Sequence, residues 1–168
     1  TLGLGLVVPA MPRLIGSVLG GDVARASEYY GAFLSTYAAM QFVFAPILGG
    51  LSDRFGRKPV ILIALFGAFL HYMLLALAPT LELLFLGRVL SGITGASFSA
   101  ATAYIADVTP REKRAQNFGL VGAAFGLGFI LGPVVGGLLR SIDVHLPFFA
   151  AGALAIVNGL YGWWVLPE

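Results

Sequence analysis

The sequence predicts an all-α protein that crosses a membrane several times and folds as a bundle of six transmembrane helices. Of its 168 residues, 58% are hydrophobic and 11% are charged, whereas a soluble domain usually carries about 25% charged residues. Five segments that are free of acidic and basic side chains, apart from one arginine, each supply the ~20 residues that a membrane-spanning helix requires. We therefore expect lipid, not water, to surround most of the chain.

The composition also excludes several other classes of protein. A disordered chain lacks apolar residues, and a net charge of +2 is too small for a nucleic-acid-binding surface. The chain has no cysteine, which excludes disulfides and thiolate metal sites. No H-E-x-x-H, G-x-S-x-G or G-x-x-x-x-G-K-[ST] motif is present, so the sequence gives no support to an enzyme or to direct coupling to ATP.

The whole chain, residues 1–168, is expected to form one bundle with helices at about 1–18, 30–51, 59–79, 82–106, 115–139 and 146–166. The first helix is unusual because its charge-free part, Thr1–Pro12, would rise only about 18 Å. We therefore expect the chain to begin partway through this helix, whose outer end runs past Pro9 and Pro12. Residues 13–28 are rich in glycine and mixed in charge, which predicts a flexible external loop.

The basic residues between the helices indicate the orientation of the bundle. The loops after the second and fourth helices carry six of them, whereas the loops after the first, third and fifth carry three: Arg54, Arg57, Lys58, Arg111, Lys113 and Arg114 against Arg13, Arg25 and Arg140. Because cytoplasmic loops are enriched in lysine and arginine, we expect the loops around 52–58 and 107–114 to be cytoplasmic.

The loop from Gly49 to Pro59 carries the sharpest motif of the sequence. Gly56 permits the positive φ of a tight reversal. Arg54, Arg57 and Lys58 suit a loop whose only role is to set the orientation of the protein in the membrane. Asp53 is not needed for that purpose. We therefore hypothesise that Asp107, at the end of the fourth helix, pairs with Arg54 or Arg57, while Asp53 caps or pairs with another group. Such a network acts as a conformational latch if it is broken when two bundles move.

Small residues recur in the fifth helix. Gly128, Gly132 and Gly136 are four residues apart, so they line one helix face and allow another helix to approach closely. Pro133 removes a backbone hydrogen bond and favours a kink. Tight packing and a functional kink are both compatible with this pattern.

Four polar side chains are predicted to lie within the membrane. Arg88 either extends outward to the interface or serves a function, which is the default expectation for an ionisable residue inside a membrane. Gln41 and Asn158 suit interhelical hydrogen bonds as well as contact with a substrate. His71 is either a satisfied packing residue or a proton carrier, because imidazole titrates near neutral pH.

Three of these segments together resemble the major facilitator superfamily. Residues 49–58 meet the pattern G-x-L-[small]-D-R-x-G-R-K, 88–95 resemble its fourth-helix motif, and 128–137 resemble the fifth-helix motif of its proton-coupled exporters. The chain is similar to the amino-terminal half of a twelve-helix transporter. Within the superfamily, residues 37–46 and 87–96 are most similar to bacterial tetracycline/proton antiporters, which commonly carry an aspartate at the position of His71.

This resemblance implies an antiporter of the bacterial inner membrane that exports drug-like molecules, tetracyclines among them, by alternating access. The proton gradient would drive it without a metal or another cofactor. Its partners would be the bilayer, protons, a small-molecule substrate and a carboxy-terminal six-helix half. The resemblance implies a coupling role for Arg88 and a transport role for the fifth-helix motif, which includes Gly128, Gly132, Pro133, Gly136 and Gly137. A transporter of a sugar or another metabolite, and a membrane scaffold without transport, remain as alternatives.

Overall fold

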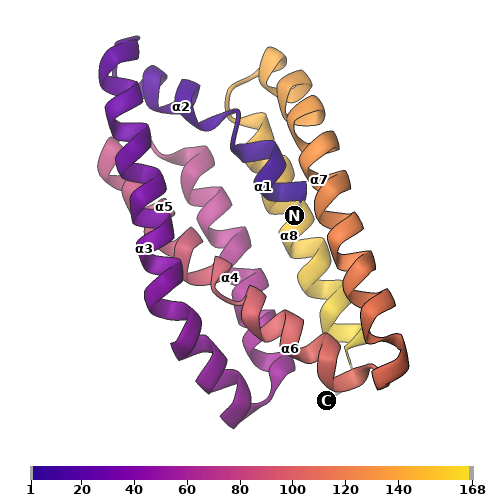
Figure 1. The fold of residues 1–168 in the computed structure, drawn as a ribbon. Coiled ribbons are helices and arrows are strands. Elements are labelled where there is room, and N and C mark those ends of the chain that lie inside the picture. The colour runs from indigo at the N-terminus through magenta and orange to yellow at the C-terminus, as the bar shows by residue number, and fades with distance from the viewer. Residues whose placement is uncertain (1, 167–168) are drawn as a thin grey trace.

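The computed structural model describes residues 2–166, and all regular elements among them are helical. In chain order these are α1 (Leu2–Val7), α2 (Met11–Val18), α3 (Val23–Phe55), α4 (Arg57–Leu77), α5 (Leu81–Gly95), α6 (Phe98–Val108), the short 3₁₀ helix η1 (Arg111–Lys113), α7 (Arg114–Ile142) and α8 (Leu146–Val165). The longer helices run up and down along a common direction (Figure 1). The α3–α4 and α6–α7 connections lie at one end of this bundle, which we call the basic end, together with the last turn of α8.

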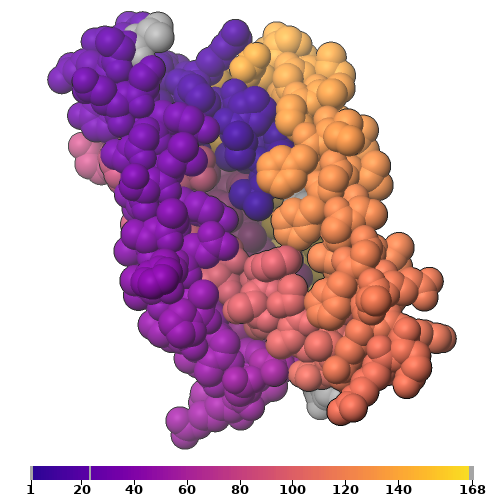
Figure 2. Space-filling model, viewed as in Figure 1, coloured from indigo at the N-terminus to yellow at the C-terminus, as the bar shows by residue number. Residues whose placement is uncertain are grey.

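Five helical stretches are long and apolar enough to cross a membrane: 24–55, 57–77, 81–108, 111–142 and 146–165. Their outer surfaces remain apolar, with the side chain of Phe42 83% exposed and that of Trp164 87% exposed. One face of the molecule shows α3 and α7 as two columns, with α1 and α6 between them (Figure 2). The all-helical membrane fold predicted from composition is confirmed.

The first predicted helix is divided in two. Residues 8–10 form turns between α1 and α2, and Pro9 and Pro12 lack the N–H groups that would continue the helical hydrogen bonds. The guanidinium of Arg140 donates from Nη1 to the Pro9 carbonyl at 3.1 Å, so this side chain satisfies a carbonyl at the break.

The predicted flexible loop at 13–28 is wrong in extent, because α2 and α3 occupy most of it. Only residues 19–22 connect the two helices. Gly20 and Gly21 have φ angles of 66° and 95°, which glycine adopts without steric cost. Asp22 then caps α3, since its Oδ1 accepts a hydrogen bond from the backbone N–H of Arg25 at 3.1 Å.

The predicted fourth helix is interrupted as well, because α5 ends at Gly95 and α6 begins at Phe98. At the break the hydroxyl of Ser97 donates to the carbonyl of Thr94 at 2.6 Å. The Nε2 group of Gln41 donates to the Gly95 carbonyl at 3.5 Å. The Thr94 carbonyl also accepts the backbone N–H of Ser97 at 3.2 Å, so the two side chains add hydrogen bonds to carbonyl groups at the interruption.

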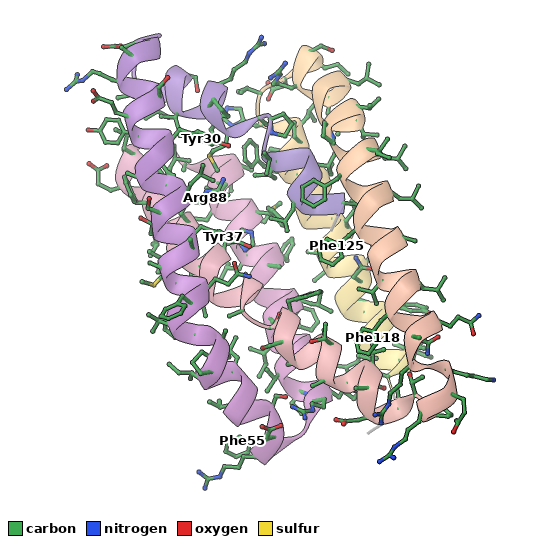
Figure 3. All side chains as sticks on the ribbon, viewed as in Figure 1. Tyr30, Tyr37, Phe55, Arg88, Phe118 and Phe125 are labelled. Carbon is green, nitrogen blue, oxygen red and sulfur yellow. The ribbon has the colours of Figure 1, made fainter. Side chains whose placement is uncertain are left out.

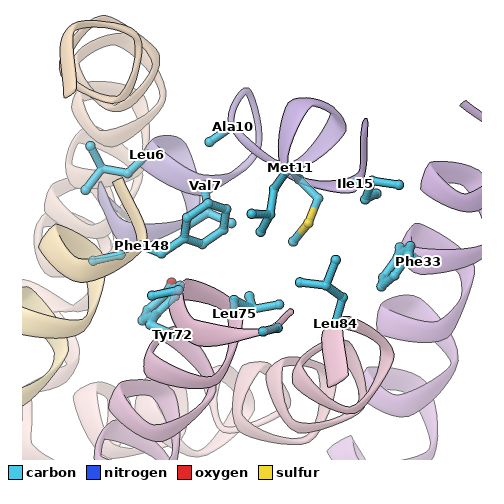
Figure 4. Packing of buried hydrophobic residues seen from close by; sticks show 14 of the residues in the cluster. Leu6, Val7, Ala10, Met11, Ile15, Phe33, Tyr72, Leu75, Leu84 and Phe148 are labelled. Carbon is cyan, nitrogen blue, oxygen red and sulfur yellow. The ribbon is translucent and has the colours of Figure 1, made fainter. Parts of the chain in front are cut away.

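A hydrophobic core fills the end of the bundle covered by α2 (Figure 4). Met11 of α2 and Leu84 of α5 are fully buried there, and the rings of Phe33 and Phe85 stack with centroids 4.1 Å apart. The close-up shows Leu6 and Val7 of α1 beside Phe148 of α8 (Figure 4). This core fixes α1 and α2 against α3, α4, α5 and α8.

The backbones of α1 and α7 are in direct contact, and glycine makes this possible. A Cβ atom at Gly5 would lie 2.5 Å from the Gly128 carbonyl oxygen, and one at Gly136 would lie 2.7 Å from the Leu6 carbonyl oxygen. Gly132 packs directly on the backbone of Gly5. By contrast, a Cβ atom at Gly137 would meet nothing within 4 Å.

Candidate functional site

At the basic end, one arginine joins three helix ends. Arg57 begins α4, and its guanidinium contacts Asp53 of α3 through Nη1 at 2.5 Å and Asp107 of α6 through Nε at 3.0 Å. Its Nη1 also donates to the hydroxyl of buried Ser52 at 2.7 Å. Gly56, with a φ of 95°, makes the reversal that places Arg57 between the two carboxylates. We call Asp53, Arg57 and Asp107 the ion-pair cluster.

This cluster differs in part from the expected one. Of the two candidate partners for Asp107, the structure selects Arg57, and Asp53 pairs with the same arginine rather than with a group elsewhere. Arg54 instead lies over the ring of Phe55, with its guanidinium carbon 5.3 Å from the centroid. Gly49 has open space around it, so no close approach requires a glycine there.

The centre of the bundle contains a cavity of about 200 Å³. It lies between α1, α3, α4, α5 and α8, and its wall is apolar with a set of hydrogen-bonding side chains. Those polar side chains are Tyr37, His71, Tyr72, Arg88, Ser91, Thr94, Ser97 and Asn158. A central cavity with a few convergent polar groups is a typical small-molecule site.

Arg88 is the charged group in the wall of this cavity. Its side chain is 5% exposed, and its Nε has no hydrogen-bond partner. No ion pair involves Arg88 anywhere in residues 2–166. Tyr30 and Tyr37 of α3 lie on the side of α5 that carries Arg88 (Figure 3), close enough to interact with its charge. The guanidinium therefore has polar neighbours but no carboxylate to balance it.

His71 lies in the same wall and is also buried. Its Nδ1 is 3.3 Å from the hydroxyl of Thr94, and its ring centroid is 4.2 Å from that of Tyr72. Arg88 is near enough to act on its charge. The contact with Thr94 is the hydrogen bond that a buried packing residue needs, and the place in the cavity wall is the one that a proton carrier needs.

Gln41 makes the interhelical hydrogen bond that is one of its two expected roles, and it is not among the residues that line the cavity. It bonds to the Gly95 carbonyl because α3 and α5 pack tightly there: a Cβ atom at Gly92 would lie 2.7 Å from the Tyr37 carbonyl oxygen. Conversely, sequence reasoning missed Tyr37, Tyr72 and Thr94 as cavity residues. A tyrosine in an apolar helix is usually a packing residue, so the sequence carried no signal for Tyr37 and Tyr72.

Pro133 lies within α7, which continues through it to Ile142, and its side chain is exposed on the bundle surface. Among residues 2–166 there is no group of three or more His, Asp or Glu side chains that would hold a metal ion.

Comparison with known protein families shows to which family the chain belongs. The model of the Major Facilitator Superfamily matches residues 1–168. The chain belongs to this superfamily. Its members are transporters and not enzymes, so the family resemblance seen in the three motifs is confirmed.

Relatives within the superfamily cover the chain almost completely. The chain is 48% identical over 99% of its length to the class C tetracycline resistance protein of Escherichia coli, and covers 42% of that protein. It is 36% identical over 99% of its length to multidrug resistance protein 1 of Bacillus subtilis, again covering 42%. The chain thus spans less than half the length of these relatives, within their amino-terminal halves.

The fold of this superfamily half is also found in a solved transporter. The human organic anion transporter MFSD10 superposes with a TM-score of 0.83 and 26% sequence identity over 99% of this chain and 44% of that one. The overall fold of the chain is therefore that of a known transporter.

Proposed function

We propose that the chain is the amino-terminal half of a proton-coupled antiporter that exports drug-like small molecules by alternating access. The observation that carries the proposal is the 48% identity to a tetracycline resistance protein over 99% of the chain. The protein would lie in the bacterial inner membrane with the basic end cytoplasmic, since that end holds Arg54, Arg57, Lys58, Arg111, Lys113 and Arg114.

The unbalanced charge of Arg88 supports proton coupling. A cation close to a carboxylate favours its ionised form. If an acidic side chain of the second half approaches Arg88 in one conformation, it releases its proton there, and it binds a proton again when it withdraws. Arg88 thus couples a change of conformation to proton transfer without itself changing charge.

The ion-pair cluster supports a latch at the cytoplasmic end. Arg57 connects α3 and α4 to α6, and the side chains of Asp53 and Asp107 are 66% and 58% exposed. Exposed ion pairs stabilise a fold by only about 0–1 kcal/mol. Such a free energy is small for folding but sufficient to shift the balance between two conformations of a transporter.

Asp107→Asn is therefore expected to lower transport in inverted membrane vesicles about threefold, because the ion pair between Asp107 and Arg57 is lost. The amount of protein in the membrane should stay unchanged. Asp53→Asn should act in the same direction. Glu112→Gln is the matched control, because Glu112 is exposed at the same end outside the cluster. Equal transport by wild type and both aspartate variants would refute the latch.

The proposed function itself is tested with the full-length transporter in proteoliposomes. An imposed pH gradient should drive tetracycline accumulation, and a protonophore should abolish it. Accumulation without dependence on the pH gradient would reject proton coupling. A panel of further drug-like compounds is tested in the same way, and the absence of transport for every one of them would favour the scaffold alternative.

A second candidate function is transport of an anionic metabolite. Arg88 offers an unpaired cation to the central cavity, and the similar MFSD10 is described as an organic anion transporter. The same panel should therefore include organic carboxylates. Transport of these and not of tetracycline would select the metabolite over the drug.

A further inference from the structure

A second hollow lies on the outside of the bundle between α4 and α8. Its volume is about 430 Å³, and it is lined by Lys58, Pro59, Leu62, Ile63, Phe66 and Trp163. We call it the outer groove. Apart from the ammonium of Lys58 and the indole N–H of Trp163, these side chains offer only apolar surface.

The outer groove faces away from the central cavity. Its five α4 residues lie within one face of that helix, since positions three and four apart are neighbours. The α4 residues that line the central cavity, among them Ala64, Ala68 and His71, lie on the opposite face. The side chains of Ile63 and Trp163 are 71% and 60% exposed. In a membrane-spanning bundle, such a surface contacts lipid.

Lys58 places a positive charge at the basic end of this groove. The nearby carboxylates of Asp53 and Asp107 both bind Arg57. Lys58 itself is half-buried, and no hydrogen bond or ion pair to its ammonium occurs within residues 2–166. An apolar groove thus ends in a cation that has no partner among the residues that the structure describes.

We propose that the outer groove binds one anionic glycerophospholipid, with an acyl chain against Leu62, Ile63 and Phe66 and the phosphate on Lys58. Basic pockets between transmembrane helices attract anionic headgroups. Trp163 lies where an amphipathic ring suits the boundary between headgroups and tails. A zwitterionic lipid also carries a phosphate, but its own cation weakens attraction to Lys58. The site therefore selects net negative lipid.

Native mass spectrometry of the full-length transporter tests this proposal. The protein is taken from nanodiscs that contain equal amounts of phosphatidylglycerol and phosphatidylcholine. Wild type should retain one phosphatidylglycerol in preference to phosphatidylcholine, and Lys58→Gln should retain about fivefold less of it. Lys58→Arg keeps the charge and should retain the lipid. Lys113→Gln removes an exposed cation from the same end and should also retain it. Equal retention by Lys58→Gln and Lys113→Gln would overturn the proposal.

Tryptophan fluorescence tests the position of the bound lipid independently of mass spectrometry. Phosphatidylglycerol with brominated acyl chains should quench a component of tryptophan emission that is missing in Trp163→Phe and present in Trp164→Phe. The quenching should reach half its maximum at a lower mole fraction than with brominated phosphatidylcholine. Equal quenching by the two lipids at every mole fraction would show ordinary bilayer contact and overturn the selectivity.

Discussion

Gly132→Ala is expected to destabilise the bundle strongly. Its Cβ atom would meet the Cα and carbonyl carbon of Gly5 and lie 3.1 Å from the backbone nitrogen of Leu6. These are backbone atoms, which cannot rotate away as a side chain can. Overpacking of this kind costs about 1–3 kcal/mol, a large part of the roughly 5–15 kcal/mol that stabilises a typical protein.

The measurement is the midpoint of thermal unfolding of the full-length transporter in detergent. It is monitored by the loss of the folded peak in gel filtration. Gly136→Ala should lower the midpoint too, because its Cβ atom would lie 2.7 Å from the Leu6 carbonyl oxygen. Gly126→Ala and Gly137→Ala add the same methyl group where nothing lies within 4 Å, so they should not lower it. An unchanged midpoint for Gly132→Ala would mean that α1 and α7 separate without cost.

The contact between α1 and α7 also illustrates how much of the helix packing can be predicted from the sequence. The spacing of Gly128, Gly132 and Gly136 predicts a helix face that permits close approach. It does not name the partner, because a stripe of small residues accepts any helix of suitable shape. Gly5, in the short first segment, completes the contact from the other side.

The interruptions of the first and fourth predicted helices had different signals. Pro9 and Pro12 are visible in the sequence, but proline near the end of a transmembrane helix is compatible with a continuous kinked helix. The break after Gly95 has no proline and lies within an apolar stretch, so hydropathy runs through it. Ser97 and Gln41 donate side-chain hydrogen bonds to carbonyl groups at this break, and Gln41 is distant in sequence.

The ion-pair cluster was foreseen only as a set of alternatives. The loop motif identifies charged side chains that face one end of the bundle, but the choice between Arg54 and Arg57 depends on the angle between α3 and α4. That angle is set at Gly56, whose φ of 95° reverses the chain. A one-dimensional pattern contains the glycine but not the direction in which each arginine then points.

Arg88→Met is expected to abolish most of the pH-driven transport while leaving the protein folded. Arg88 makes no ion pair within residues 2–166, so methionine, which is also long and flexible, removes no ion pair from this half. What it removes is the positive charge in the central cavity. Without that charge, an approaching carboxylate keeps its proton, and the link between proton release and conformational change is lost.

Two transport measurements in proteoliposomes separate proton coupling from the conformational change that moves the substrate. Uptake driven by an imposed pH gradient should fall about tenfold or more in Arg88→Met, as expected when a coupling free energy of about 1–3 kcal/mol is lost. Exchange of labelled for unlabelled substrate without a gradient should persist, because it needs alternating access but no net proton transfer. Arg88→Lys retains the charge and should keep part of the driven uptake, and Arg25→Gln, an exposed arginine at the opposite end, should keep all of it. If Arg88→Met showed driven uptake at the wild-type rate, the charge of Arg88 would serve substrate binding or folding and not proton coupling.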